Sequence, residues 1–303
     1  MNSLFVFPNG TRKAVTFTID DGNLPLDKKF IDIVRPAGIK GTFNLMGTER
    51  MSNMTPEEYR EFYRGFEIAN HCGMHPKVIT ESEKELISDE KFVSSEANTE
   101  LLYKTDMEGL YYKYYRAWWG YVATPETYIK LVARAKAELE SVFGEGNIKA
   151  FVWPYCEQND DAVKAYLAKN YESVRRTGSA TFELPKDRMA WCYNATHANL
   201  NERAAEFETE DNGGELMFLC FGVHSHDFEN NHCWDVLEKF AEKYGNRPHD
   251  FWYATVGEIF EYEDAVKSAT VTDGEIVNGS GISIYVKVDG KTVEIKPGEV
   301  YKR

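Results

Sequence analysis

The sequence of 303 residues contains no segment of the kind that crosses a membrane. No stretch approaches the roughly 18 consecutive apolar residues that a membrane-spanning helix needs. The first residues, MNSLFVFPNGTRK, lack the basic start and the long apolar centre of a secretory signal peptide. Internal repeats and low-complexity tracts are also missing. These absences predict a soluble, cytoplasmic protein with no membrane partner.

Cysteine pairs and clustered positive charge are missing as well. The cysteines are odd in number and form no C-x-x-C pair, which suits a reducing compartment better than a disulfide framework. They are Cys72, Cys156, Cys192, Cys220 and Cys233. The chain has 49 acidic and 35 basic residues, and its net charge of −14 argues against a nucleic-acid partner. It carries no signal for a particular oligomeric state.

Short β-type runs alternate with helical patterns over most of the chain. The runs cover residues 14–19, 41–46, 66–70, 150–155, 171–177, 215–223 and 251–256. Strand–helix alternation implies right-handed crossovers and a mostly parallel sheet. Seven such units in about 260 residues predict an α/β fold, a distorted and incomplete (β/α)7 barrel.

Helix start signals support this alternation. Thr55 precedes Pro56 and is followed three residues later by Glu58, which is the pattern of a capping box. The same Thr-Pro opening recurs at 124–125, where a helical pattern extends to the glycine at 144. Residues 160–170 and 233–246 also have amphipathic helical spacing.

Two regions depart from the alternation. From about Ala265 the helical pattern gives way to alternating strands with an Asp-Gly turn at 289–290. We therefore divide the chain into a barrel, residues 1–264, and a small C-terminal β appendage, residues 265–303, packed on it. No strand is expected over 78–149, which contains the aromatic run YYKYYRAWWGY.

Polar side chains with metal-binding chemistry stand at three predicted strand ends. The active residues of β/α barrels lie at these carboxyl ends. The clusters are the acids Asp20 and Asp21, the histidines His71 and His75, and the histidines His224 and His226.

Their spacing favours a catalytic metal site over coincidence. Histidines four residues apart share a face if the segment turns helically, and a carboxylate from another strand end would complete a three-ligand set with open positions. A fourth side chain, a free carboxylate, would then be placed as a base. Alone, D-D-G is most often a turn and H-x-x-x-H most often surface histidine. However, four of the seven histidines lie in these clusters.

Four motifs resemble those of the polysaccharide deacetylase family, the NodB-homology domain. They are TIDDG, NHCGMHP, WPY and HSHDF, in this order, within residues 14 to about 260. The resemblance implies that Asp20 is the catalytic base. It implies that Asp21, His71 and His75 bind a divalent metal, usually zinc. It also implies that His224 is the general acid, with His226 as the alternative.

The third motif departs from the family pattern. Val152 stands where typical members have an arginine that steadies the base, and Arg116 is a candidate to replace that cation. Trp153 and Tyr155 are the expected pocket residues at this strand end. For Trp191 and His197 a place in the pocket and a core or capping role are both open. The aromatic run is open between stacking on sugars and ordinary packing.

Together these patterns predict a metal-dependent hydrolase that removes acetyl groups from an N- or O-acetylated carbohydrate. A metal-activated water would attack, Asp20 would accept its proton and His224 would protonate the leaving group. Two alternatives stay open: hydrolysis of another C–N bond in a small amide or formamide, and a non-catalytic carbohydrate-binding protein on the same fold.

Overall fold

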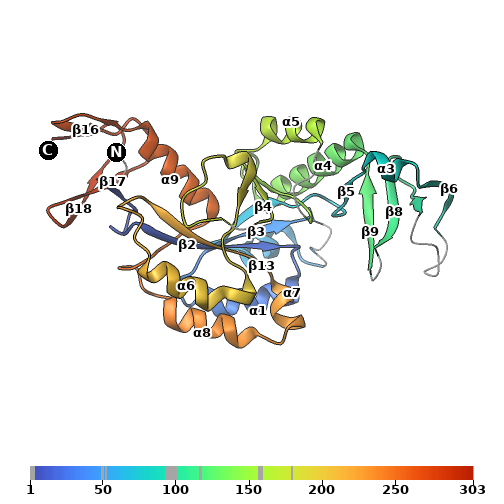
Figure 1. The fold of residues 1–303 in the computed structure, drawn as a ribbon, viewed down its shortest axis with the longest axis horizontal. Helices are drawn as coiled ribbons and strands as arrows, with labels where there is room; N and C mark the ends of the chain where they lie inside the picture. Colours follow the sequence, from blue (N-terminus) through green and yellow to red (C-terminus); the bar gives the residue numbers. More distant parts are fainter. Residues whose placement is uncertain are drawn as a thin grey trace.

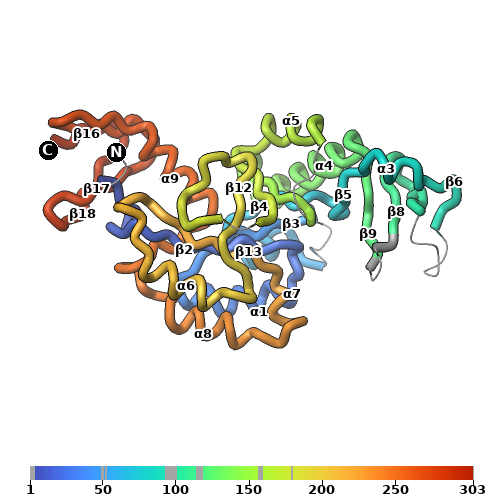
Figure 2. The backbone as a smooth tube through the Cα atoms, viewed as in Figure 1, coloured from blue at the N-terminus to red at the C-terminus, as the bar shows by residue number. Residues whose placement is uncertain are grey.

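The protein has a central barrel with a β arm at one end and a β appendage at the other (Figure 1). The computed structural model describes residues 4–48, 51, 53–92, 101–115, 118–155, 160–178 and 180–302. Both termini lie at the appendage end (Figure 2).

The central sheet is parallel throughout the strand pairs described. Its strands follow the order β12-β11-β10-β4-β3-β2-β13, and β14 pairs with the start of β2. They are β2 (Lys13–Asp20), β3 (Gly41–Leu45), β4 (Glu67–Asn70), β10 (Ala150–Val152), β11 (Ser173–Arg176), β12 (Trp191–Cys192), β13 (Met217–His224) and β14 (Trp252–Tyr253). All seven predicted strands are present, and the incomplete α/β barrel is confirmed.

The element that bridges the two edges of the sheet was not predicted. Strand β12 pairs with β11, and the residues just after it reach across to β13. There the amide of Asn194 donates to the carbonyl of Cys220 at 3.0 Å, and the amide of Gly222 donates to the carbonyl of Ala195 at 2.9 Å. A two-residue strand gives no periodic signal in a sequence, so this short bridge is invisible there.

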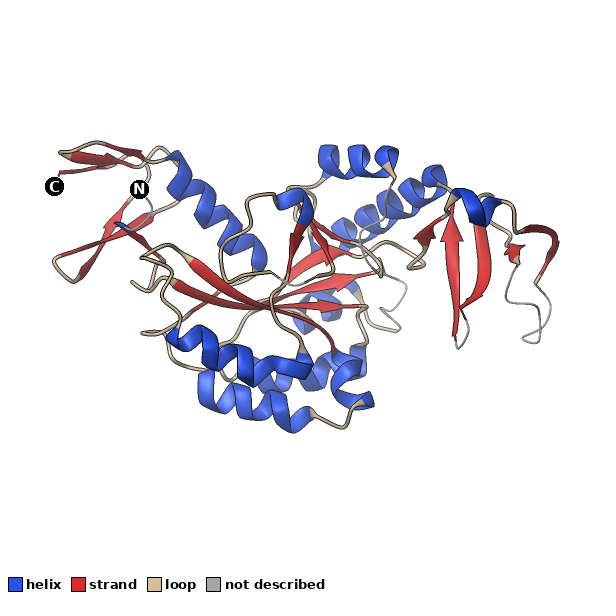
Figure 3. Cartoon of the chain, viewed as in Figure 1, coloured by secondary structure: helices blue, strands red, loops and turns tan. Residues whose placement is uncertain are grey.

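Helices cover the sheet on both sides (Figures 1 and 3). They are α1 (Leu24–Val34), α2 (Pro56–Phe62), α3 (Glu81–Lys84), α4 (Pro125–Phe143), α5 (Asp161–Asn170), α6 (Leu200–Thr209), α7 (Ser225–Asn230), α8 (Trp234–Tyr244) and α9 (Val256–Ser268). The predicted capping box of Thr55 and Glu58 opens α2, and the Thr-Pro signal at 124–125 opens α4. Among these described helices, none is both long and apolar enough to cross a membrane.

Alternation along the strands places two different environments on the two faces of the sheet. On β2, Phe17 and Ile19 pack into the apolar cluster shared with α1 and α8. The residues that alternate with them, Thr16, Thr18 and Asp20, face the other way, and all three are buried. The inner face of the barrel is therefore polar towards the carboxyl ends of the strands.

The expectation of a strand-free region from 78 to 149 was wrong. A five-stranded sheet of order β5-β9-β8-β7-β6 fills most of it and forms the arm in Figure 1. Its strands are β5 (Lys77–Val78), β6 (Ile87–Lys91), β7 (Leu102–Lys104), β8 (Leu110–Tyr115) and β9 (Trp118–Ala123). The aromatic run lies on the antiparallel pair β8–β9, where aromatic residues have high strand propensity.

The appendage consists of two small sheets, and the N-terminal strand belongs to one of them. The first has the order β1-β17-β18 and the second β15-β16-β19. Their strands are β1 (Phe5–Val6), β15 (Thr270–Val271), β16 (Glu275–Val277), β17 (Ile284–Val288), β18 (Lys291–Ile295) and β19 (Val300–Lys302). Because α9 ends at Ser268, residues 265–268 are helical rather than the start of strands. The domain division at 264/265 stays a prediction.

Candidate functional site

The carboxyl ends of the central strands converge on one cavity of about 530 Å³. The register explains the convergence, because His224 pairs with Asp20 across β13 and β2, and Asp20 pairs with Asn44 across β2 and β3. The histidine loop follows β4 directly. The cavity is lined by Asp20, Asp21, His71, His75, Trp153, Tyr155, Thr177, Tyr193, Gly222, Val223, His224 and His226.

Asp20 is held from two sides by buried hydrogen-bond donors. The guanidinium Nη2 of Arg175 donates to its Oδ2 at 2.5 Å, and Nδ2 of Asn44 donates to its Oδ1 at 2.6 Å. Burial raises the pKa of the Asp20 carboxyl, but the positive charge of Arg175 leads the opposing effects and leaves that pKa below its usual value. Asp20 is therefore an ionised carboxylate fixed at the cavity wall.

Arg175 supplies the cation that the third motif lacks, and the sequence reasoning missed it. It lies on β11, where Val152 of β10 pairs with it, so the charge comes from the neighbouring strand. Only 1% of its side chain is exposed. A signal was present, since one of two adjacent arginines in the short strand SVRRT must face inward, and a buried arginine needs an acidic partner. Arg116, the candidate replacement, lies outside the described residues.

Asp21, His71 and His75 form a set that fits a divalent cation. Oδ1 of Asp21 lies 3.5 Å from Nε2 of His71 and 3.6 Å from Nε2 of His75, and the two Nε2 atoms are 3.2 Å apart. Ligands about 2.0–2.2 Å from a tetrahedral zinc ion are about 3.3 Å from one another. This Oδ1 atom is buried without a hydrogen-bond partner, as expected for an oxygen whose partner is an ion.

The protonation of this set also suits a cation. Nδ1 of His71 lies 2.8 Å from the carbonyl oxygen of Val152 and donates to it, which leaves Nε2 as the free acceptor. Burial and the neighbouring His71 lower the pKa of His75 to about 4, so this ring is neutral.

His224 lines the same cavity and lies between two carboxylates, Asp20 and Asp227. Nε2 of His224 lies 3.8 Å from Oδ2 of Asp20, and its Nδ1 lies 3.0 Å from Oδ2 of Asp227. Burial lowers the pKa of His224, but the Asp227 hydrogen bond and the charges of Asp20 and Asp21 raise it to about 9. His224 is thus a charged imidazolium able to donate a proton.

Asp227 was missed by the sequence reasoning, although its position carried a signal. It lies three residues after His224, the last residue of β13 and the N-cap of α7, and its Oδ2 also accepts from the His224 amide at 2.9 Å. An acid three residues into a helix that starts with a histidine is the capping-box spacing. Nδ1 of His197 lies 3.3 Å from the same Asp227 oxygen, so His197 stands behind the site.

Backbone strain is concentrated around the cavity. Among the described non-glycine residues, those with positive φ in the site loops are Asp21, Cys72, Met74, His75 and Tyr155. Outside glycine, such conformations are uncommon and cluster at sites where the surrounding structure holds them for function. The strained residues therefore lie in the three loops, after β2, β4 and β10, that contribute side chains to the cavity.

Aromatic side chains form the remaining wall. Trp153 and Tyr155 line the cavity as expected, and the Tyr155 ring meets the His75 ring edge to face with centroids 4.6 Å apart. Tyr193 was not predicted. It lies directly over Gly222, where any added Cβ atom would come within 2.2 Å of the Tyr193 ring.

The structure places the other sequence candidates elsewhere. Trp191 is buried in the apolar cluster that includes α9, where it packs against Phe218 and Phe260. It is not among the described residues that line the cavity. Its core role, left open by the sequence, is the one the packing favours. The described part of the aromatic run lies on the arm, where the Tyr112 and Trp119 rings stack at 5.0 Å.

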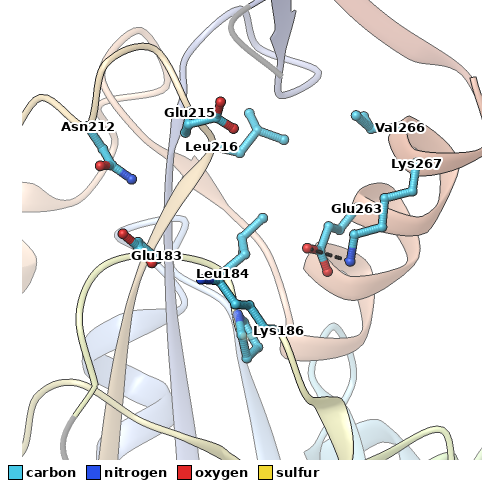
Figure 4. Close-up of a pocket in the computed structure, with 10 residues that line it drawn as sticks. Glu183, Leu184, Lys186, Asn212, Glu215, Leu216, Glu263, Val266 and Lys267 are labelled. Carbon is cyan, nitrogen blue, oxygen red and sulfur yellow. Dashed lines mark ion pairs between the residues drawn. The ribbon is translucent and has the colours of Figure 1, made fainter. Parts of the chain in front are cut away.

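A second cavity, of about 450 Å³, lies between the loop at 183–186, the start of β13 and α9 (Figure 4). Its lining mixes carboxylates with lysines, and Nζ of Lys267 lies 2.8 Å from Oε1 of Glu263. Its described lining contains no histidine. The described groups of histidines and acids that could hold a metal ion lie in the first cavity.

Comparison with known proteins agrees with this architecture. The family model described as Polysaccharide deacetylase matches residues 8–174. No curated protein matches the chain. A solved structure assigned to the polysaccharide deacetylases, from Mycobacterium smegmatis, is 18% identical, with a TM-score of 0.54 over 89% of this chain and 96% of that one. It has the same fold.

Two further solved structures resemble the chain more distantly. The Xyl-CE4 domain of a multidomain xylanase, from the hindgut metagenome of Trinervitermes trinervoides, is 15% identical, with a TM-score of 0.47 over 84% of this chain and 92% of that one. A family 4 acetyl xylan esterase from Clostridium thermocellum, in complex with a cobalt ion, is 16% identical, with a TM-score of 0.45 over 83% and 92%. From the match to the family model, with the fold in agreement, the chain belongs to the polysaccharide deacetylase family and is a hydrolase.

Proposed function

We propose that this hydrolase removes acetyl groups from an N- or O-acetylated carbohydrate and that a divalent cation, with zinc as the first choice, is required. The observation that carries the proposal is the orphaned, buried Oδ1 of Asp21 facing the two Nε2 atoms of His71 and His75. Two imidazoles and one carboxylate leave coordination positions open, as catalytic zinc sites do.

The roles of the chain's own groups follow from their charges. A cation held by Asp21, His71 and His75 would lower the pKa of a bound water and polarise the acetyl carbonyl. Asp20 is ionised and fixed by Arg175, so it can accept the proton of the attacking water. His224 is protonated and can donate a proton to the departing amine or alcohol. Trp153 and Tyr155 would narrow the cavity around the acetyl group.

The test is acetate release from chitooligosaccharides and acetylated xylan, with and without a chelator, alongside metal analysis of the purified protein. We expect bound divalent metal, and release that the chelator abolishes and added Zn²⁺ restores. Asp20→Asn should lose turnover while keeping the metal, and Asp21→Asn should lose both. Asp32→Asn, an exposed acid on α1 paired with Lys28, is the matched control.

Other outcomes would identify the competing functions. Sugar binding without acetate release in the metal-loaded protein would favour a carbohydrate-binding protein. Metal-dependent hydrolysis of small amides or formamides alone would move the substrate to another C–N bond. A purified protein without any divalent ion would overturn the metal assignment.

A further inference from the structure

Asp21 faces two histidine pairs with its two carboxylate oxygens. Its Oδ1 points at His71 and His75, as described, whereas its Oδ2 lies 3.9 Å from Nδ1 of His226. Asp21, His224 and His226 can each offer one ligand atom, and these atoms all lie within 4.8 Å of one another. The same carboxylate therefore belongs to two potential three-ligand groups in one cavity.

Asp227 faces both histidines of the second group and forms a hydrogen bond with one of them, His224. Nδ1 of His224 faces Asp227 Oδ2 at 3.0 Å, which leaves its Nε2 to the cavity, and Nε2 of His226 lies 4.0 Å from Asp227 Oδ1, which leaves its Nδ1 to Asp21. Metal-binding histidines commonly direct their second ring nitrogen at a carboxylate, which fixes the tautomer and the ring orientation. The His224 ring has this arrangement, whereas Nε2 of His226 is beyond hydrogen-bond distance of Asp227.

We propose that Asp21, His224 and His226 form a second divalent-cation position, with Asp21 bridging it to the first, and that filling it inhibits the enzyme. The inhibitory part depends on the proposed function, in which His224 donates a proton. Nε2 of His224 cannot hold a proton and bind a cation at the same time. A cation there would also lie close to Asp20, because Asp20 Oδ2 is 3.8 Å from that nitrogen.

The second position should bind more weakly than the first. In the first group the ligand atoms are 3.2 to 3.6 Å apart, close to the spacing around a bound ion, whereas in the second Asp21 and His226 are 3.9 Å apart. The second group must contract to bind. Its histidine side chains are 37% and 34% exposed, against 1% for His71 and 24% for His75. Two cations sharing one carboxylate also repel each other.

The nitrogen-rich ligands indicate which ions would bind. Imidazole and carboxylate together suit Zn²⁺, Co²⁺, Ni²⁺ and Cu²⁺, whereas Mg²⁺ and Ca²⁺ prefer oxygen ligands. Excess Zn²⁺ or Co²⁺ should therefore inhibit, and excess Mg²⁺ should not.

The direct test is metal stoichiometry. Protein freed of metal by a chelator is titrated with Zn²⁺ and Co²⁺ by calorimetry and by dialysis with metal analysis. We expect two ions per chain, the second weaker than the first. His226→Ala should bind one. Asp227→Asn should weaken the second ion about 10- to 100-fold and spare the first. His249→Ala, an exposed histidine outside the cavity, should still bind two.

Acetate release at increasing Zn²⁺ gives the second readout. We expect activity to rise with the first ion and fall with the second, and the fall to disappear in His226→Ala whatever its maximal rate. If His226→Ala misfolds, Asp227→Asn should shift the fall to higher Zn²⁺. One ion per chain with an active enzyme and no fall would overturn the second position and leave the proposed function standing. Two ions without any acetate release would support the second position and overturn the proposed function.

Discussion

Arg175 decides the charge state of the proposed base. Its guanidinium is buried, donates to Asp20 Oδ2 and also donates to Oγ1 of Thr18 at 3.1 Å. Removing one partner of a buried ion pair leaves the other charge uncompensated. The pair therefore connects the stability of the barrel to the chemistry of the site.

Arg175→Met should damage both stability and the pH profile. We expect the free energy of unfolding to fall by about 3–5 kcal/mol, because Asp20 loses its buried partner. Burial then raises the pKa of Asp20 without opposition from the guanidinium, so the acidic limb of the pH–activity profile should move to higher pH. Urea unfolding and acetate release across pH measure the two effects.

Arg176→Met is the matched control for this variant. Arg176 is the next residue on β11 and is exposed. Its loss should leave the acidic limb in place. If both variants gave the same profile, the pairing of Arg175 with Asp20 would have no role in setting the base.

His224, the proposed acid, and Asp227 should together set the alkaline limb of the pH–activity profile. The pKa of His224 is raised to about 9, so the acid is protonated below that pH, and activity should fall as pH rises through it. Asp227→Asn removes the hydrogen bond and charge that raise this pKa, so the limb should move to lower pH. The alkaline limb should move to lower pH with or without a bound cation, since the wild type and the Asp227→Asn variant would hold the same ion. The profile of kcat/KM against pH checks it.

Asp235→Asn separates this effect from a general loss of negative charge. Asp235 is an exposed acid on α8, paired with Lys239 at 2.7 Å. The Asp235→Asn substitution should leave the alkaline limb of the profile unchanged. An Asp227→Asn profile that coincides with that of the wild type would contradict the role of Asp227 in positioning and charging His224.

At the scale of elements, the capping box of α2 is a reciprocal interaction. The Thr55 hydroxyl accepts from the Glu58 amide at 3.3 Å, and the Glu58 carboxylate accepts from the Thr55 amide at 2.8 Å. Thr55→Ala should cost about 1 kcal/mol of unfolding free energy. Urea unfolding of Thr55→Ala, of Glu58→Ala and of the double variant should show that the double variant loses less stability than the sum of the two single losses. Additive losses would mean that the two residues act independently.

Strands and helix starts were predictable because their signals are local. The central strand β2 alternates with a period of two, and the Thr-Pro openings of α2 and α4 carry their own caps. The arm was missed because the polar and acidic residues of β6 give no alternating apolar pattern, and the aromatic run reads equally as core packing.

The candidate site was predictable in its motifs and hidden in its long-range partners. Asp20, Asp21, His71 and His75 stand at strand ends that a parallel sheet must bring to one edge, and they meet there. Arg175 reaches Asp20 across 155 positions of sequence, and only the strand order and register reveal that contact. No spacing within the sequence relates the two residues.

At the scale of the whole molecule, the barrel and the appendage share the same strands. On β13, Leu219 and Phe221 pack into the cluster with the outer helices, whereas Phe218 and Cys220 pack into the cluster with α9 and the appendage. Strand β13 thus contributes one face to each cluster. Neither cluster can lose its packing without exposing the other face of β13, so we expect the two to unfold together.

Tyr262 of α9 gives a way to test this coupling. Its hydroxyl donates to the carbonyl of Val6 on β1 and accepts from the amide of Tyr285 on β17 at 3.0 Å. Tyr262→Phe should lower the free energy of unfolding by about 1–3 kcal/mol, because one buried and one partly buried backbone group lose their partner. The unfolding midpoint should shift equally whether far-UV circular dichroism or tryptophan fluorescence is followed, since Trp153 and Trp191 lie in different clusters. Acetate release should stay unchanged below the transition, since Tyr262 is remote from the cavity lining. If the two signals separated, the appendage would unfold by itself, and the shared strands would not couple it to the catalytic end of the barrel.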